Sequence, residues 1–209
     1  MKTLHISLRK AGKGQSFVEL AIVFMLLLSM LAGVVEFGNL LNQYINVIDG
    51  DREGARFASN TSPFLTPGSD DFNEAFYTGT DEVIEGTYDP VTGEQLSKSA
   101  IEPVKLDPAT DDVVISVFAI DINGTVTRFP QGMDYGWNKY GNGQSQFTNS
   151  DVQGLVAGTK DLAPNTGMIL VEIFYNYHTL LQMPFLPDPI PLHAYAVMPL
   201  TAAEATPTP

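Results

Sequence analysis

The sequence predicts an α+β protein in which one long N-terminal helix packs on a small antiparallel sheet. Two observations indicate this fold class. The only long apolar stretch lies near the N-terminus, and residues with helical spacing follow it without a break. The rest of the chain instead holds short runs of β-branched and aromatic residues, separated by Gly-, Pro- and Asn-containing turn signals.

The apolar stretch predicts a membrane-spanning helix. Phe17 to Val35 contain one charged residue, Glu19. At about 1.5 Å per residue these residues extend roughly 28 Å, which is close to the hydrocarbon thickness of a bilayer. A cleavable secretory signal has a shorter apolar core followed by a small-residue cleavage site. We therefore expect residues 15–35 to form a transmembrane helix that is retained.

The helix is expected to continue beyond the membrane, over residues 36–59. Apolar residues recur there at steps of three and four, and the segment 60–63 (NTSP) is a typical helix end. Gly50, Gly54 and Ala58 fall four residues apart and therefore form one stripe. Small residues at this spacing allow the close approach of either a partner helix or the domain's own sheet, and we favour the sheet.

Residues 60–200 are expected to form an extracytoplasmic α+β domain, followed by a flexible tail at 201–209. Residues 63–110 indicate loops with one short helix near 71–77. Strands are predicted at 112–120, at 125–129 after the hairpin signal Asn123-Gly124, at 168–178 and at 191–198. The segments 132–149 and 184–191 indicate a loop and a proline-rich turn. We expect the strands to pack on the helix near Ala55 and Ala58.

Charge predicts the orientation. Residues 1–14 form a basic leader with Lys2, Arg9, Lys10 and Lys13 and no acidic residue, whereas the whole chain carries −13. Basic flanks remain in the cytoplasm, so we expect the N-terminus inside and the C-terminal domain outside. The remaining −17 argues against nucleic-acid binding. The chain has no cysteine, so the domain must depend on its apolar core rather than on disulfides.

A possible processing site lies at the start of the apolar stretch. Glu19 is the fifth residue after Gly14. This is the pattern that a prepilin peptidase recognises in pilin-like precursors, and cleavage would make Gln15 the first residue. In that case Glu19 would pair with the free α-amine of Gln15, its own or a neighbour's. Alternatively, Gly14 is an ordinary linker residue, Glu19 extends toward the headgroups, and the segment is a plain signal anchor.

Residues 14–59 resemble the N-terminal module of TadE-like pilus-assembly proteins. The family pattern is a glycine, Val-Glu-Phe/Leu, an apolar stretch, Gly-x-x-Glu-Phe/Tyr-Gly and Arg-Glu-Gly-Ala-Arg. The matching positions here are Gly14, Val18, Glu19, Leu20, Gly33, Glu36, Phe37, Gly38, Arg52, Glu53, Gly54, Ala55 and Arg56.

The end of the chain is similar to the closing strand pair of the same family. There a strand ends in Tyr-x-Tyr, a proline-containing turn follows, and a last strand precedes a terminal glutamate. The segments GMILVEIFYNYHTLLQMPFLP and IPLHAYAVMPLTAAE follow this order, with Glu204 as the glutamate. Residues 60–167 do not align with the family pattern.

The resemblance implies a pilin-like fold and a minor pseudopilin that takes part in assembly of a tight-adherence (Flp-type) pilus. It implies a single-pass protein of the cytoplasmic (inner) membrane without catalytic activity or cofactor. Its partners would be other pilin or pseudopilin subunits, pilus-assembly platform proteins and prepilin peptidase. Major pilins of these systems carry Glu-Tyr where this chain has Glu19-Leu20. The alternative is an uncleaved, signal-anchored extracytoplasmic binding or adhesion domain.

Other chemistry has weak support in the sequence. His178 and His193 lie on neighbouring predicted strands and, with Glu172 or Asp188, could bind a metal, but two half-exposed strand histidines are the preferred interpretation. The acidic pairs 70–71, 81–82 and 111–112 lack the spacing of a calcium loop, so we expect a solvated surface there. No Gly-x-Ser-x-Gly motif, phosphate-binding loop or His-Glu-x-x-His motif is present. We therefore expect no metal site and no enzyme activity.

Overall fold

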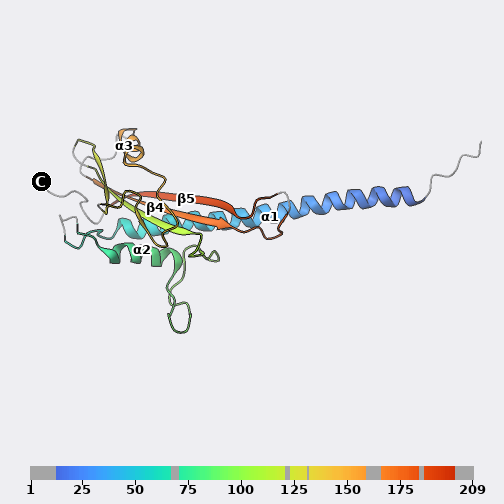
Figure 1. Ribbon diagram of the computed structural model, residues 1–209, viewed down its shortest axis with the longest axis horizontal. Coiled ribbons are helices and arrows are strands. Elements are labelled where there is room, and N and C mark those ends of the chain that lie inside the picture. The colour runs from blue at the N-terminus through green and yellow to red at the C-terminus, as the bar shows by residue number, and fades with distance from the viewer. Residues whose placement is uncertain are drawn as a thin grey trace, which may run out of the picture.

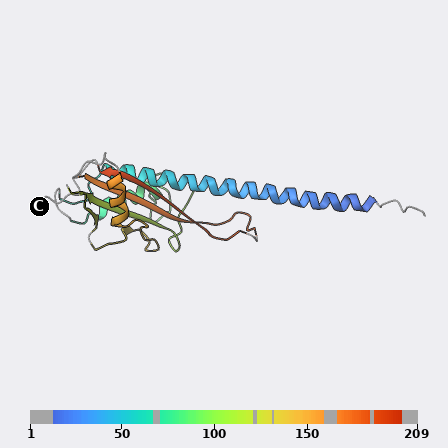
Figure 2. The ribbon, with the colours of Figure 1, turned by 90° about the horizontal axis from the view of Figure 1, so that it is seen from above.

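The computed structural model describes residues 13–66, 71–120, 123–130, 132–158, 166–183 and 186–200. One helix, α1 (Lys13–Ser59), runs through the length of this part of the molecule, and the other elements gather around its C-terminal half (Figures 1 and 2). This confirms the predicted fold class and the continuation of the helix to Ser59. Residues 1–12 of the predicted leader, the predicted tail and Glu204 lie outside the described residues.

Antiparallel strands form one sheet in the order β2-β1-β4-β5. The strands are β1 (Asp112–Ile120), β2 (Val126–Phe129), β4 (Thr166–Tyr177) and β5 (Ile190–Leu200). The two-residue strand β3 (Trp137–Asn138) also pairs with β1, inside the segment that the sequence predicts as a loop. The other strands lie where the sequence predicts them. β5 contains Pro191 and Pro199 and is an edge strand, where a missing N–H is tolerated.

Both faces of the sheet are covered, which explains why every residue of β1 is buried. Odd-numbered residues of β1 and β4, such as Ile115 and its register partner Val171, face α1 and the helix α2 (Glu74–Glu85). Even-numbered residues such as Phe118 and Leu170 face the opposite side, where Val152 of the helix α3 (Asn149–Gly158) packs. Figure 1 shows α2 and α3 on opposite sides of the strands.

The two shorter helices differ from the sequence prediction, and local sequence features explain both differences. The short helix predicted near 71–77 lies further along the chain, as α2, because its buried face recurs through Thr80 to Ile84. The helix α3 was not predicted. Its start carries a capping box, in which the Asp151 amide donates to Thr148 Oγ1 at 3.2 Å and the Thr148 amide donates to Asp151 Oδ2 at 2.8 Å.

The stripe of small residues on α1 seats other parts of the same domain. A β-carbon at Gly50 would lie 2.1 Å from Cγ2 of Ile101 and 3.4 Å from Cδ1 of Ile173 in β4. A β-carbon at Gly54 would lie 2.7 Å from Cδ1 of Ile84, so at this position the close neighbour is α2 rather than the sheet. Ala58 is also fully buried. At Gly50 the sheet therefore contributes Ile173 behind the closer Ile101, which lies outside the sheet, and at Gly54 the favoured interpretation is wrong.

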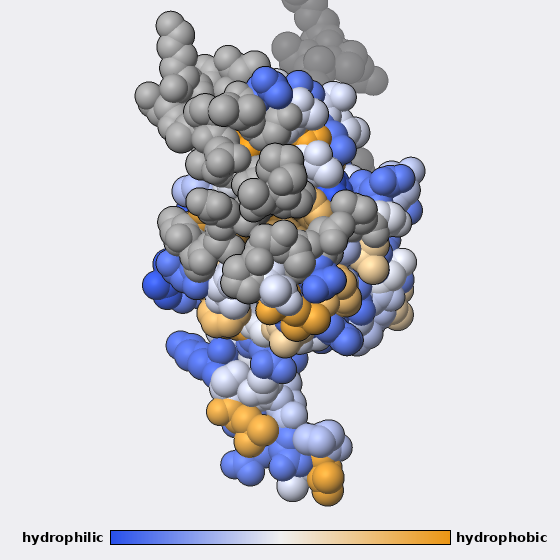
Figure 3. All heavy atoms as spheres, turned by 90° about the vertical axis from the view of Figure 1, so that its left-hand side faces the viewer, coloured by the Kyte–Doolittle hydropathy of each residue, from blue (hydrophilic) through white to orange (hydrophobic). Residues whose placement is uncertain are grey.

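The domain surface away from the apolar half of α1 is largely polar. Figure 3 views the molecule from that end, and blue and white residues cover much of the described surface, with small orange patches between them. A projecting loop at residues 87–97 is closed by a bridge between Tyr88 and Gln95. Val91, at 90% exposure, lies on this loop.

Candidate functional site

The N-terminal half of α1 is an apolar helix that no other described element covers. Its large apolar side chains from Phe17 to Val35 are exposed, and it is long and apolar enough to cross a membrane by length and composition. Figure 1 shows this half of α1 projecting away from the domain. A helix that is apolar all round is stable in water only when buried, so lipid or other helices are its natural surroundings.

The predicted processing residues lie in the first turns of this exposed helix. Gly14 has no heavy atom within 4 Å of where a β-carbon would stand, so its surface is open. The side-chain amide of Gln15 donates to Glu19 Oε1 at 3.2 Å. Glu19 and Gln15 thus lie one turn apart on the same helix face. The pairing of Glu19 with an α-amine at Gln15 stays a prediction.

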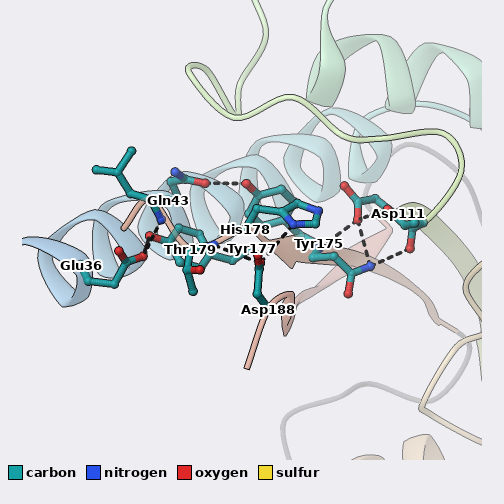
Figure 4. Close-up of polar contacts among 11 residues, drawn as sticks. Glu36, Gln43, Asp111, Tyr175, Tyr177, His178, Thr179 and Asp188 are labelled. Atoms are coloured by element: carbon teal, nitrogen blue, oxygen red, sulfur yellow. Dashed lines mark hydrogen bonds and ion pairs between the residues drawn. The ribbon is translucent and has the colours of Figure 1, made fainter. Parts of the chain in front are cut away.

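Glu36 closes the charge-free stretch of α1 and is the best-bound carboxylate of the helix. Only 2% of the residue is exposed. Its Oε1 accepts hydrogen bonds from the Tyr177 hydroxyl at 2.5 Å and the Leu180 amide at 2.9 Å, and its Oε2 accepts one from the Leu181 amide at 2.8 Å. Figure 4 shows Glu36 directed from the helix toward the end of β4. A carboxylate beside a membrane segment is costly unless such donors satisfy it.

Tyr177 belongs to a row of polar contacts that fastens the β4–β5 hairpin to α1. The Asn39 side-chain amide donates to the Tyr177 hydroxyl at 2.9 Å, and the Tyr175 hydroxyl donates to Gln43 Oε1. Burial and the bond to Glu36 raise the pKa of the Tyr177 hydroxyl, so it stays protonated and can donate. Residues 36, 39 and 43 share a face of α1, and alternate residues of β4 share a face of the sheet. The Tyr-x-Tyr pattern therefore supplies the side chains by which β4 binds to α1, and we call this set of contacts the clamp.

The Arg-Glu-Gly-Ala-Arg segment is divided between the core and the surface. Gly54 and Ala55 are buried, whereas Arg52 and Arg56 are exposed. Arg56 pairs with Glu53. Arg52 Nη1 lies 3.6 Å from Asp49 Oδ1.

These charged side chains line an open groove of about 900 Å³ between α1, α2 and the segment 97–102. Each arginine of the motif already faces an acidic residue on its own helix. The arginine charges of the groove are therefore paired within α1 itself.

Asp51 is an unexpected residue of the same helix. It is fully buried against the sheet, and neither carboxyl oxygen has a hydrogen-bond partner among the described residues. Burial and the charge of Glu172 raise the pKa of Asp51 to about 9. The side chain is therefore protonated at neutral pH. The sequence signal for this is the position of Asp51 one turn after Val47, on the buried face of α1.

The histidines occupy two separate polar pairs. His178 Nδ1 lies 3.1 Å from Asp188 Oδ1 at the hairpin tip (Figure 4), and His193 Nε2 lies 3.1 Å from Glu172 Oε1. His178 is exposed and His193 is half-buried against the ring of Phe174. Within the described residues, no group of three or more His, Asp or Glu is placed to hold a metal ion.

The expected solvated surface is wrong for several of the acidic residues. Asp112 is fully buried, and its carboxylate accepts the amides of Tyr140 at 2.9 Å and of Asn142 and Gly143 at 2.7 Å each. Asp111 is also buried and accepts the Asn176 amide at 2.9 Å.

Asp81 is buried as well, and its Oδ2 lies 2.6 Å from Lys139 Nζ. Sequence alone does not reveal these roles, because the donors come from segments distant in the chain. The acidic side chains organise those loops instead of facing water.

Comparison with known proteins identifies one family. The model of the TadE-like protein family matches residues 14–56, the segment that carries the motif described above. This confirms the resemblance inferred from the sequence. No curated protein and no solved structure matches the chain.

Proposed function

Because the TadE-like family model matches the helix that carries the exposed apolar segment and the clamped carboxylate, we propose that this chain is a membrane-anchored minor pseudopilin. It takes part in assembly of a tight-adherence pilus. The observation that carries the proposal is the build of α1, which is one uninterrupted helix with a free apolar half and a domain on its other half.

The mechanism of this function is structural rather than catalytic. The apolar half of α1 holds the subunit in the cytoplasmic membrane and packs with the corresponding helices of other pilin or pseudopilin subunits. The charge at Glu19 favours the axial register in which it meets an α-amine, since an unpaired carboxylate in lipid is unfavourable. The acidic domain outside the membrane faces the assembly platform and the growing filament.

Mass spectrometry of the full chain from its native membrane tests the processing step. We expect a mature N-terminus at Gln15 and a Gly14→Leu variant that keeps the 14-residue leader. Gly33→Leu, at another open position of α1, is the control and should still be cleaved. A wild-type protein that retains Met1 would instead support a signal-anchored binding or adhesion domain.

The role of Glu19 is tested by pilus assembly. We expect Glu19→Ala to be cleaved but to fail to restore pili in cells that lack this chain, because the register contact is lost. Glu94→Ala removes a carboxylate from the exposed loop at 87–97 and should restore pili. Normal piliation with Glu19→Ala would argue against this mechanism.

A further inference from the structure

We propose that the tip of the β4–β5 hairpin is a second membrane contact, in which Leu180 and Leu181 insert into the lipid boundary beside the transmembrane helix. The two backbone amides are bound to Glu36, so these leucines lie at the level of residue 36. Residue 36 directly follows the charge-free stretch from Leu20 to Val35. This inference rests on the proposed membrane anchoring.

The exposure of the tip points to lipid. Leu180 is 62% exposed and Leu181 is 44% exposed, although their backbone is fixed to the helix. Phe37, which follows Glu36 on α1, is 61% exposed. Apolar side chains from two elements thus lie uncovered at the same level of the helix, where the boundary of the bilayer is expected.

Charge limits the contact to this tip. Residues 179–187 contain no charged side chain. The nearest ionisable groups on the hairpin, His178 and Asp188, pair with each other at its base (Figure 4). The carboxylate of Glu36, which binds the backbone of the tip, accepts hydrogen bonds from three donors. The hairpin can therefore enter the boundary region without burying an unpaired charge.

The length of the β4–β5 hairpin supports the same placement of its tip at the lipid boundary. Figure 2 shows the β4–β5 hairpin extending along α1 toward its N-terminal half, further than the other described parts of the domain. The chain outside the leader is strongly acidic, so attraction to anionic lipid does not explain the contact. Burial of the leucine side chains explains the contact instead, because it removes apolar surface from water.

Depth-dependent fluorescence quenching of the full chain in phosphatidylcholine vesicles tests the inference. In a Trp137→Phe background, single tryptophans are placed by Leu180→Trp, by Leu27→Trp within the apolar helix, and by Val91→Trp on the exposed loop. Lipids carry a nitroxide either near the headgroup or near the end of the acyl chain. We expect Leu180→Trp to be quenched more by the shallow nitroxide, Leu27→Trp more by the deep one, and Val91→Trp by neither.

The outcomes separate this inference from the proposed function. Quenching at position 27 without quenching at position 180 overturns the hairpin contact and leaves the membrane anchor standing. Absence of quenching at position 27 overturns both. An emission blue shift at position 180 without lipid quenching, growing with the protein-to-lipid ratio, would mean that a second copy covers the tip and would also overturn the proposal.

Discussion

At the scale of single residues, Asp51 makes the stability of the domain depend on pH. Its pKa is raised to about 9 in the folded chain, whereas an unfolded aspartate releases its proton near pH 4. The folded state therefore holds a proton that the unfolded state has lost. Stability is fully present below about pH 4 and falls as pH rises toward 9, by at most about 1.4 kcal/mol per pH unit.

We therefore expect Asp51→Asn to flatten the decline of stability between pH 5 and pH 8.5. The asparagine amide has no proton to lose in this range. The free energy of unfolding of the variant therefore rises relative to that of the wild type as pH rises. Urea unfolding of the full chain in detergent micelles, followed through Trp137, measures this. Asp89→Asn, on the exposed loop, is the control, because hydrogen bonds within its turn lower its pKa. Parallel pH profiles of wild type and Asp51→Asn would contradict the assignment.

A second residue-scale prediction separates glycines that seat a neighbour from glycines that do not. Gly50→Ala places a β-carbon against the buried Ile101, so overpacking of about 1–3 kcal/mol should exceed the gain of about 1 kcal/mol in helix propensity. Gly38→Ala meets no heavy atom within 4 Å and should keep the propensity gain. Urea unfolding in micelles measures both. A Gly50→Ala protein as stable as Gly38→Ala would show that Ile101 moves aside without cost.

At the scale of elements, the polar row between α1 and β4 determines how firmly the hairpin is held. Tyr177 is fully buried and bridges Asn39 and Glu36. Tyr195 is exposed on the neighbouring strand and is a matched control. The row continues from the apolar core near Val47 toward the membrane end of α1, and its contacts with α1 include the hydrogen bonds of Tyr175 and Tyr177.

We expect Tyr177→Phe to loosen the hairpin tip without unfolding the sheet. Loss of a hydrogen bond to a carboxylate should speed amide exchange at Leu180 and Leu181 by about tenfold. Exchange in the middle of β4, for example at Val171, should change little. Tyr195→Phe should leave both regions unchanged. Hydrogen–deuterium exchange of the full chain in micelles gives the comparison, and unaltered exchange at the tip in Tyr177→Phe would refute the clamp.

At the scale of the whole molecule, charge and apolarity are separated along α1. The leader is basic, the first half of the helix is apolar, and the domain that follows is acidic. This arrangement predicts the leader inside the cell and the domain outside.

A reporter that is active only outside the cytoplasm, fused after Pro209, tests the orientation. We expect it to be active, because the basic leader holds the N-terminus inside. Replacing Lys2, Arg9, Lys10 and Lys13 by glutamine should reduce this activity by weakening the charge asymmetry. Activity from a cytoplasm-specific reporter at the same position of the unaltered chain would reverse the orientation.

The sequence by itself determined the elements with strong local signals. The helix to Ser59, the strands β1, β2, β4 and β5 and the hairpin at Asn123-Gly124 follow from periodicity and turn chemistry, which act between near neighbours. The candidate site at Gly14 and Glu19 and the family motif were also readable, because their spacing lies within one helix. The short strand β3 has no such signal, whereas the start of α3 carries one in the capping box of Thr148 and Asp151.

Only the tertiary structure decided how the polar residues are satisfied. Glu36 is a motif residue in the sequence, but its partners Tyr177, Leu180 and Leu181 lie more than 140 residues away. Asp111 and Asp112 look like surface acids until the fold buries them. Pattern arguments reach a few residues along the chain, whereas burial and hydrogen bonding depend on which distant segments the sheet register and the helix face bring together.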